Sequence, residues 1–174
     1  EFTQELSFQN RIRYLNTNYR EHLQKYDLNL DGKSAEDLDK ALKQLWSDIV
    51  KVYAASNDDF FVLHLVTGTR AFNLIFNELQ ELQHKKEALQ YFWKSVVAAY
   101  IARGAPFIDN AKWQIDSKLP DWSTIIAKGI EEPKDHEDEH LIKLVFVCHE
   151  NDTDIGIDPI HRLVAARKVG LLPW

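Results

Sequence analysis

The sequence predicts an all-α protein, built as a multi-helix bundle or array with long connecting loops. Almost every long segment repeats its apolar residues with helical period, and no segment shows the alternating pattern of a half-buried strand. Helix-end signals agree with this period. Ser34 followed by Asp37 resembles a capping box at a helix start, and Gly104 with Pro106 is the expected order at a helix end. These observations favour helices throughout.

The expected helices follow from the apolar stripes and the stop signals between them. The segment from residue 60 to 79 is the most apolar, so we expect it to be central, with Gly68 allowing a close approach of another element. The residues from 105 to 120 are expected to form a long connection. The helices are predicted at 4–25 with an interruption near 16–18, 34–56, 60–79, 85–103, 122–128, 138–150 and 159–168.

Composition restricts the class of protein. A chain of 174 residues that is 45% hydrophobic is expected to form one all-helical domain over residues 1–174. The net charge of -6 and the lack of a basic stripe argue against a nucleic-acid partner, and no apolar run is long enough for a membrane span. A single cysteine, Cys148, is expected to be buried and favours a reducing, cytoplasmic location. The oligomeric state stays open.

Two short motifs suggest metal binding but lack the rest of their pattern. Asp27, Asn29, Asp31 and Gly32 resemble the first half of an EF-hand loop, yet Leu38 stands where the closing glutamate belongs. We therefore interpret this segment as a polar turn that ends in a helix cap.

The second motif is the segment from His136 to His140, which satisfies the H-E-x-x-H pattern of zinc peptidases. It lies in an acidic stretch just after Pro133, where a solvated loop is expected. A zinc metallopeptidase is accordingly a weaker alternative.

Two histidines and a lysine in apolar segments need a separate explanation. For His64 alone, a core histidine bonded to a carbonyl is the simpler interpretation, but His140 in a second apolar helix could share a metal ion with it. Lys143 has the spacing for an ion pair with Glu139, although its apolar neighbours predict burial. The other residues singled out are histidines expected at the surface or at caps, and tryptophans expected in the core: His22, His84, His149 and His161, and Trp46, Trp93 and Trp122.

Four blocks of the sequence together resemble the questin oxidase-like family, in the order in which that family has them. They cover about residues 40 to 168 and are more specific than any single motif. The blocks are Asp59-Phe60-Phe61-Val62-Leu63-His64-Leu65-Val66-Thr67-Gly68, Ala99-Tyr100-Ile101-Ala102-Arg103-Gly104-Ala105-Pro106, Trp122 with Ala127, and Asp138-Glu139-His140-Leu141-Ile142-Lys143-Leu144.

The resemblance implies an all-helical oxidoreductase of oxygenase type that opens quinone or polycyclic aromatic rings in polyketide pathways. It implies a non-haem iron or another divalent metal held by His64, His140 and a carbamylated Lys143, with NADPH as a possible cofactor and no sign of flavin. Glu139 is then expected to orient the site, and Thr67 and Arg70 to lie behind the ligands or near the substrate. The expected partner is a small aromatic or quinone substrate.

The family also has upstream histidine blocks, of the type Asn-His-Leu-Pro and Phe-His, that this sequence lacks. We therefore expect the chain to be the C-terminal part of a larger unit, with an incomplete and inactive site when isolated. A helical interaction or structural module without catalysis is the main alternative.

Overall fold

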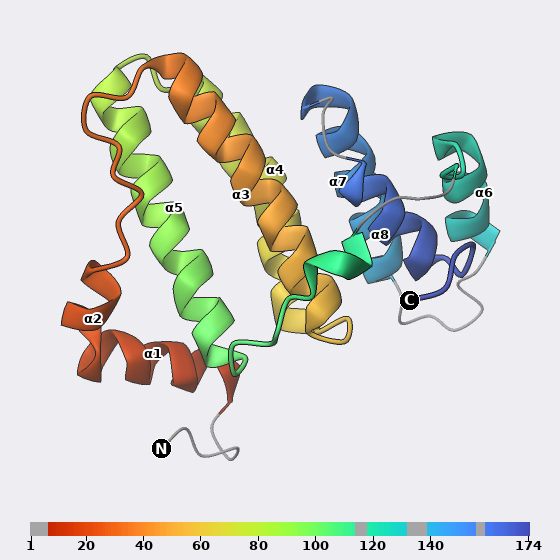
Figure 1. Ribbon diagram of the computed structural model, residues 1–174, viewed down its shortest axis with the longest axis horizontal. Coiled ribbons are helices and arrows are strands. Elements are labelled where there is room, and N and C mark those ends of the chain that lie inside the picture. The colour runs from red at the N-terminus through yellow and green to blue at the C-terminus, as the bar shows by residue number, and fades with distance from the viewer. Residues whose placement is uncertain (1–6, 114–117, 132–138, 156–158) are drawn as a thin grey trace. The chain divides into compact units, whose positions relative to one another are not determined.

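The computed structural model describes residues 7–113, 118–131, 139–155 and 159–174. Within these ranges it contains eight α-helices, one short 3-10 helix and no strand (Figure 1). The predicted all-α class is therefore confirmed. In chain order the elements are α1 (Phe8–Asn18), α2 (Arg20–Gln24), α3 (Ala35–Ala55), α4 (Phe60–Glu78), α5 (Leu82–Ala102), η1 (Asn110–Trp113), α6 (Trp122–Glu131), α7 (Glu139–Ile155) and α8 (Ile160–Lys168).

Local capping explains where several helices begin. The Ser34 hydroxyl accepts from the backbone N–H of Asp37 at 3.2 Å, and the Asp37 carboxylate accepts from the backbone N–H of Ser34 at 3.0 Å. These reciprocal bonds are the predicted capping box, and the bonds from Ser34 lower the pKa of Asp37. Asp59 starts α4 in a similar way, because its Oδ1 accepts from the N–H groups of Phe61 and Val62. Tyr19 breaks the first helix near the expected position.

The chain clusters into two compact units. Unit 1 comprises Glu1–Leu45 and Phe72–Phe107, and unit 2 comprises Trp46–Ala71 and Ile108–Trp174. The helices α3 and α4 each contribute to both units. That these units together form one domain stays a prediction.

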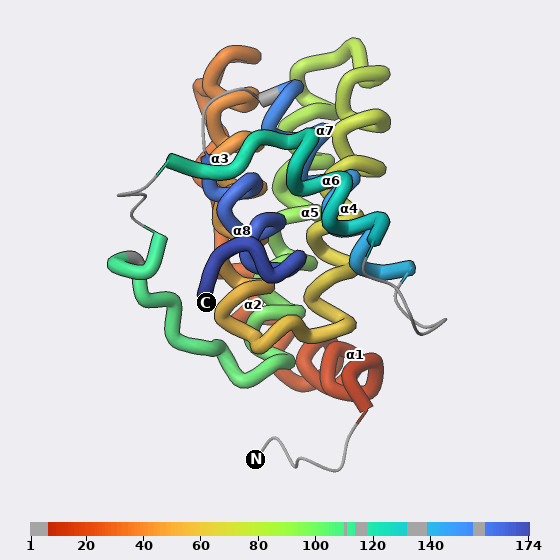
Figure 2. Tube along the Cα trace, turned by 90° about the vertical axis from the view of Figure 1, so that its right-hand side faces the viewer, coloured from red at the N-terminus to blue at the C-terminus, as the bar shows by residue number. Residues whose placement is uncertain are grey.

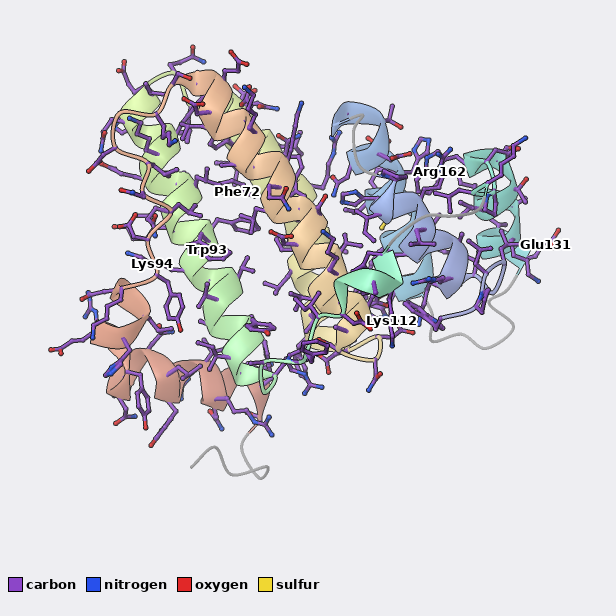
Figure 3. The ribbon with its side chains drawn as sticks, in the orientation of Figure 1. Phe72, Trp93, Lys94, Lys112, Glu131 and Arg162 are labelled. Carbon is purple, nitrogen blue, oxygen red and sulfur yellow. The ribbon has the colours of Figure 1, made fainter. Side chains whose placement is uncertain are left out.

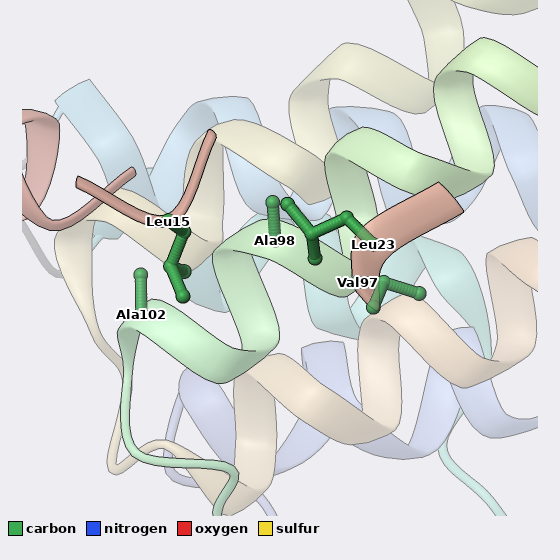
Figure 4. Close-up of a cluster of buried hydrophobic side chains, with 5 residues drawn as sticks. All are labelled: Leu15, Leu23, Val97, Ala98 and Ala102. Atoms are coloured by element: carbon green, nitrogen blue, oxygen red, sulfur yellow. The ribbon is translucent and has the colours of Figure 1, made fainter. Parts of the chain in front are cut away.

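In unit 1, α1 and α2 pack against α5. Their shared core is a cluster of five aliphatic side chains, all at most 7% exposed (Figure 4): Leu15, Leu23, Val97, Ala98 and Ala102. Elsewhere in the unit the ring of Phe72 stacks on that of Phe92, with centroids 4.3 Å apart. The amide of Gln90 fixes the chain after α2, since it accepts from the Leu28 N–H and donates to the Tyr26 carbonyl.

In unit 2, α7 packs against both α6 and α8, and Figures 1 and 2 show these three helices together. The most buried side chains between them include Ile125, Leu144, Ile160 and Val164, each at most 1% exposed. Cys148 is fully buried there, as expected, and its burial raises the pKa of the thiol. Among the described helices, none is both long and apolar enough to cross a membrane.

The structure corrects several local expectations. Helix α7 continues to Ile155, about one turn beyond the predicted end. His161 was predicted at the surface or at a cap. It is only 2% exposed, so the surface alternative was wrong, because α8 is buried on most of its faces. Gly68 allows no close approach, since a Cβ at this position would meet nothing within 4 Å. Trp46 is buried as predicted, but Trp93 and Trp122 are only half-buried.

Candidate functional site

The candidate site lies between α4 and α7, within unit 2. Contacts near the start of α7 involve earlier residues of α4 than contacts near its end, so the two helices run in the same general direction. His64 meets His140 near the start of α7, Thr69 meets Asn151 further along, and Arg70 meets Glu150 and Asp154. These contacts hold α4 beside α7 and bring His64 near His140.

The rings of His64 and His140 lie close together, although the two residues belong to separate helices. Their ring centroids are 6.3 Å apart, and the Phe60 ring contacts both edges, at 4.7 Å from His64 and 4.8 Å from His140. Sequence reasoning placed both imidazoles in the core, but His64 is exposed and the His140 side chain is 26% exposed. The pair therefore lies at an open edge of the interface.

The backbone selects the tautomer of the neutral His64 ring. His64 Nδ1 lies 2.8 Å from the carbonyl oxygen of Phe60, one turn earlier on α4. A carbonyl oxygen can only accept, so Nδ1 carries the proton and a neutral ring keeps the lone pair of Nε2. This is the arrangement in which a histidine binds a metal through Nε2 while its other nitrogen is held by the protein.

Lys143 is not buried, contrary to the expectation drawn from its apolar neighbours. Its side chain is 51% exposed, and Nζ lies 2.8 Å from Oε1 of Glu139. This hydrogen bond lowers the pKa of Glu139. The neighbours Ile142 and Phe146 are themselves about half exposed. This face of α7 is therefore open to solvent even though its residues are apolar. The ion pair four residues apart is the simpler of the two interpretations that the sequence left open.

The remaining predicted site residues, Thr67 and Arg70, form hydrogen bonds and ion pairs near His64. The Thr67 hydroxyl donates to the carbonyl of His64 at 3.4 Å, so it contacts the backbone of the proposed ligand. Arg70 pairs with Glu150 at 3.2 Å and donates to the Asp154 carboxylate. Its guanidinium is therefore occupied by two carboxylates from α7.

Sequence reasoning missed the α7 partners in this interface. Asn151 donates from its amide to the Thr69 hydroxyl at 3.0 Å, and both side chains are at most 2% exposed. The signal was present in the acids at 150 and 154, which are four residues apart and so share one helix face. It was overlooked because the helix was predicted to end at residue 150.

The structure also bears on the two weaker metal motifs. In the EF-hand-like segment, Asp27 Oδ1 accepts from the backbone N–H of Asn29 at 2.7 Å, which makes this a local turn. Among the described residues, no group of three or more His, Cys, Asp or Glu side chains could hold a metal ion. His136 of the zinc-peptidase motif lies outside the described residues.

Comparison with known proteins and families identifies a family for this chain. Neither curated proteins nor solved structures yield a relative of this chain. The family model described as questin oxidase-like matches residues 3–148, which is most of the 174-residue chain. The match includes His64, His140 and Lys143, and it supports an oxidoreductase-type function. By this match, the chain belongs to the questin oxidase-like family.

Proposed function

We propose that this chain forms part of an oxygenase-type oxidoreductase that opens quinone or polycyclic aromatic rings at a metal site. The observation that carries the proposal is the meeting of His64 and His140, from two helices of unit 2, in a member of this family. A non-haem iron or another divalent metal would supply the means to activate oxygen. NADPH is a candidate source of electrons for the reaction.

The two imidazoles fit such a metal in their chemistry. Imidazole nitrogens bind iron and zinc with bonds of roughly 2 Å, so two nitrogens that bind one ion lie no more than roughly 4 Å apart. His64 offers the lone pair of its Nε2, and both side chains are partly exposed. Their centroid separation of 6.3 Å is within reach of a shared ion after a modest rotation of the His140 ring, which leaves the bond from His64 Nδ1 to Phe60 in place.

Lys143 is the proposed third ligand. As an ammonium it cannot bind a cation, but its neutral amine can add carbon dioxide, lose a proton and become a carbamate with anionic oxygens. Lys143 lies one turn from His140 on α7. Its pair with Glu139 has to open first, so Glu139 is proposed to control when the amine is available. Thr67 and Arg70 are proposed to hold the backbone of α4 in place behind His64.

A non-catalytic helical module remains the second candidate, because one observation favours it. In the structure the Lys143 side chain is exposed and already paired with Glu139, as on an ordinary helix surface. The two candidates differ in whether the lysine ever changes its chemical state. The two candidate functions are therefore distinguished by the metal content of the protein and by whether that content depends on carbon dioxide.

The test is metal analysis of the full-length protein grown with iron. His64→Ala and His140→Ala are expected to lose most of the bound metal, with His149→Ala as the matched control on α7. His149 contacts the Trp122 ring edge-on at 5.1 Å and belongs to the packing of α6 on α7. Metal content that is the same in all three variants would refute the site.

Lys143 is tested with the same protein. Lys143→Gln is expected to lower metal content, and removing dissolved carbon dioxide and bicarbonate during reconstitution is expected to lower it in the wild type but not further in the variant. If metal content is the same with and without bicarbonate, the proposal of a carbamate on Lys143 is refuted, while His64 and His140 remain candidate ligands. Oxygen uptake with a quinone substrate then checks the activity itself.

A further inference from the structure

We infer that unit 1 contains a binding site for an amphipathic carboxylate, between α1, α2 and α5. A hollow of about 340 Å³ lies between these helices. That size is at the lower end of the roughly 300–1,000 Å³ typical of small-molecule pockets. The site is separate from the histidine pair, and the inference does not depend on the proposed oxidoreductase activity.

The floor of the hollow is apolar and consists partly of side chains from the buried cluster of unit 1. It consists of Ile12 from α1, Leu23 from α2 and Ala98 from α5. Leu23 and Ala98 belong to the buried cluster of unit 1, at 7% and 4% exposed (Figure 4). The small Ala98 leaves the space that a longer side chain on α5 would fill. A compact apolar group that enters here would cover surface that water now contacts.

The rim of the hollow is cationic. Arg20 begins α2, and Lys94 projects from α5 on the side that faces α2 (Figure 3). Within the part of the chain that the structure describes, neither cation has an acidic partner. Lys94 is nonetheless half-buried. Two cations on the rim of one hollow, with no acidic partner there, create a positive potential that favours an anion.

The combination selects the chemistry of the ligand. An inorganic anion would leave the apolar floor uncovered, and a neutral hydrocarbon would leave both cations without partners. A monocarboxylate with a short apolar chain satisfies both, with its carboxylate between Arg20 and Lys94. The amide of Asn16, also on the rim, could donate a further hydrogen bond.

The experiment titrates the isotopically labelled full-length protein with octanoate and follows the backbone amide signals. Saturable shifts are expected for residues 12–24 and 91–98. Octylamine, which has the same chain length but the opposite charge, is expected to bind at least about tenfold more weakly. Equal binding of the two probes, or shifts confined to other segments, would overturn the inference.

Two variants test the cations. Lys94→Gln and Arg20→Gln are each expected to raise the Kd for octanoate about fivefold, as for a partly exposed ion pair. Lys86→Gln is the matched control, because it removes a charge from the same helix but does not line this hollow. Arg20 is exposed, so its variant decides the question if Lys94→Gln does not fold. An unchanged Kd in Arg20→Gln would contradict the assignment.

Discussion

The side-chain amide of Asn151 donates a hydrogen bond to the hydroxyl of Thr69 over 3.0 Å, in a region where both side chains are buried. The same hydroxyl donates to the carbonyl of Val66 at 2.6 Å. Thr69 therefore uses its donor within α4 and its acceptor toward α7. This polar pair lies between the histidines and the Arg70 ion pairs, and it fixes how the two helices face one another.

Thr69→Val is expected to destabilise the protein by about 1–3 kcal/mol. The substitution keeps the shape but leaves the Asn151 amide buried without its acceptor, which costs more than the bond itself contributes. Thr67→Val is the control, since the Thr67 hydroxyl bonds only within its own helix and is partly exposed. Urea unfolding measures both variants.

The double variant Thr69→Val with Asn151→Leu sharpens this test. Removing both polar groups removes the unsatisfied amide, so the loss of stability is expected to be smaller than the sum of the two single losses. Additive losses would mean that the two side chains do not interact in solution.

Arg70→Gln is expected to lower the free energy of unfolding by about 1 kcal/mol at low salt. The Arg70 side chain is 27% exposed and pairs with two carboxylates of α7, so its contribution exceeds that of an isolated surface pair but is still partly screened. The difference from wild type is expected to shrink at 1 M NaCl because salt weakens exposed ion pairs. Lys40→Gln, which breaks a fully solvated pair with Glu36, is the control and is expected to change stability less. A difference that is unaffected by salt would indicate that Arg70 acts through packing.

Much of this architecture could be predicted from the sequence, because helical period and caps are local properties. The Ser34 and Asp37 box, the break at Tyr19 and the ends of α3 and α4 all follow from residues close in the chain. Burial of single residues was predicted less well. His161 and Lys143 were assigned to the wrong environments, because burial depends on which helix covers a face and the period of one helix does not reveal that.

The candidate site was predictable to a different extent. The family blocks identified His64 and His140, and the structure brings their rings together. Phe60 and Asn151 were missed as parts of this interface, since nothing local distinguishes a core aromatic or a turn asparagine from one that contacts another helix. The roles of His64, His140 and Lys143 as metal ligands stay predictions.

Asp121 is expected to make the stability of α6 depend on pH at the acid end. The Thr124 N–H, at 2.8 Å, and the hydroxyls of Ser123 and Thr124 hold the pKa of the Asp121 carboxyl at about 2, below its ordinary 3.8. The folded state thus favours the charged form. The resulting stabilisation is complete above about pH 4 and is lost as the pH falls from there toward 2.

Asp121→Asn tests this cap. An asparagine can still accept from the Thr124 N–H but does not titrate, so the variant is expected to lose part of the acid dependence while it keeps most of the helix cap. Asp121→Ala is expected to lose both and to melt a few degrees lower at pH 7. Thermal melts from pH 2 to pH 7 measure the two effects. Parallel pH profiles for wild type and Asp121→Asn would show that Asp121 does not contribute.

Cys148 is expected to react with iodoacetamide only when the protein unfolds. The thiol is buried in α7, burial raises its pKa, and only the thiolate is a good nucleophile. Because the chain has one cysteine, each labelled molecule reports one event. Labelling, measured by mass spectrometry, is expected to be slow in buffer and to rise with urea along the unfolding curve.

The control is Ser123→Cys in a Cys148→Ala background, which places a thiol at an exposed position and is expected to label quickly in buffer. Equally fast labelling of the native wild type would mean that α7 separates from α6 and α8 far more often than this packing predicts.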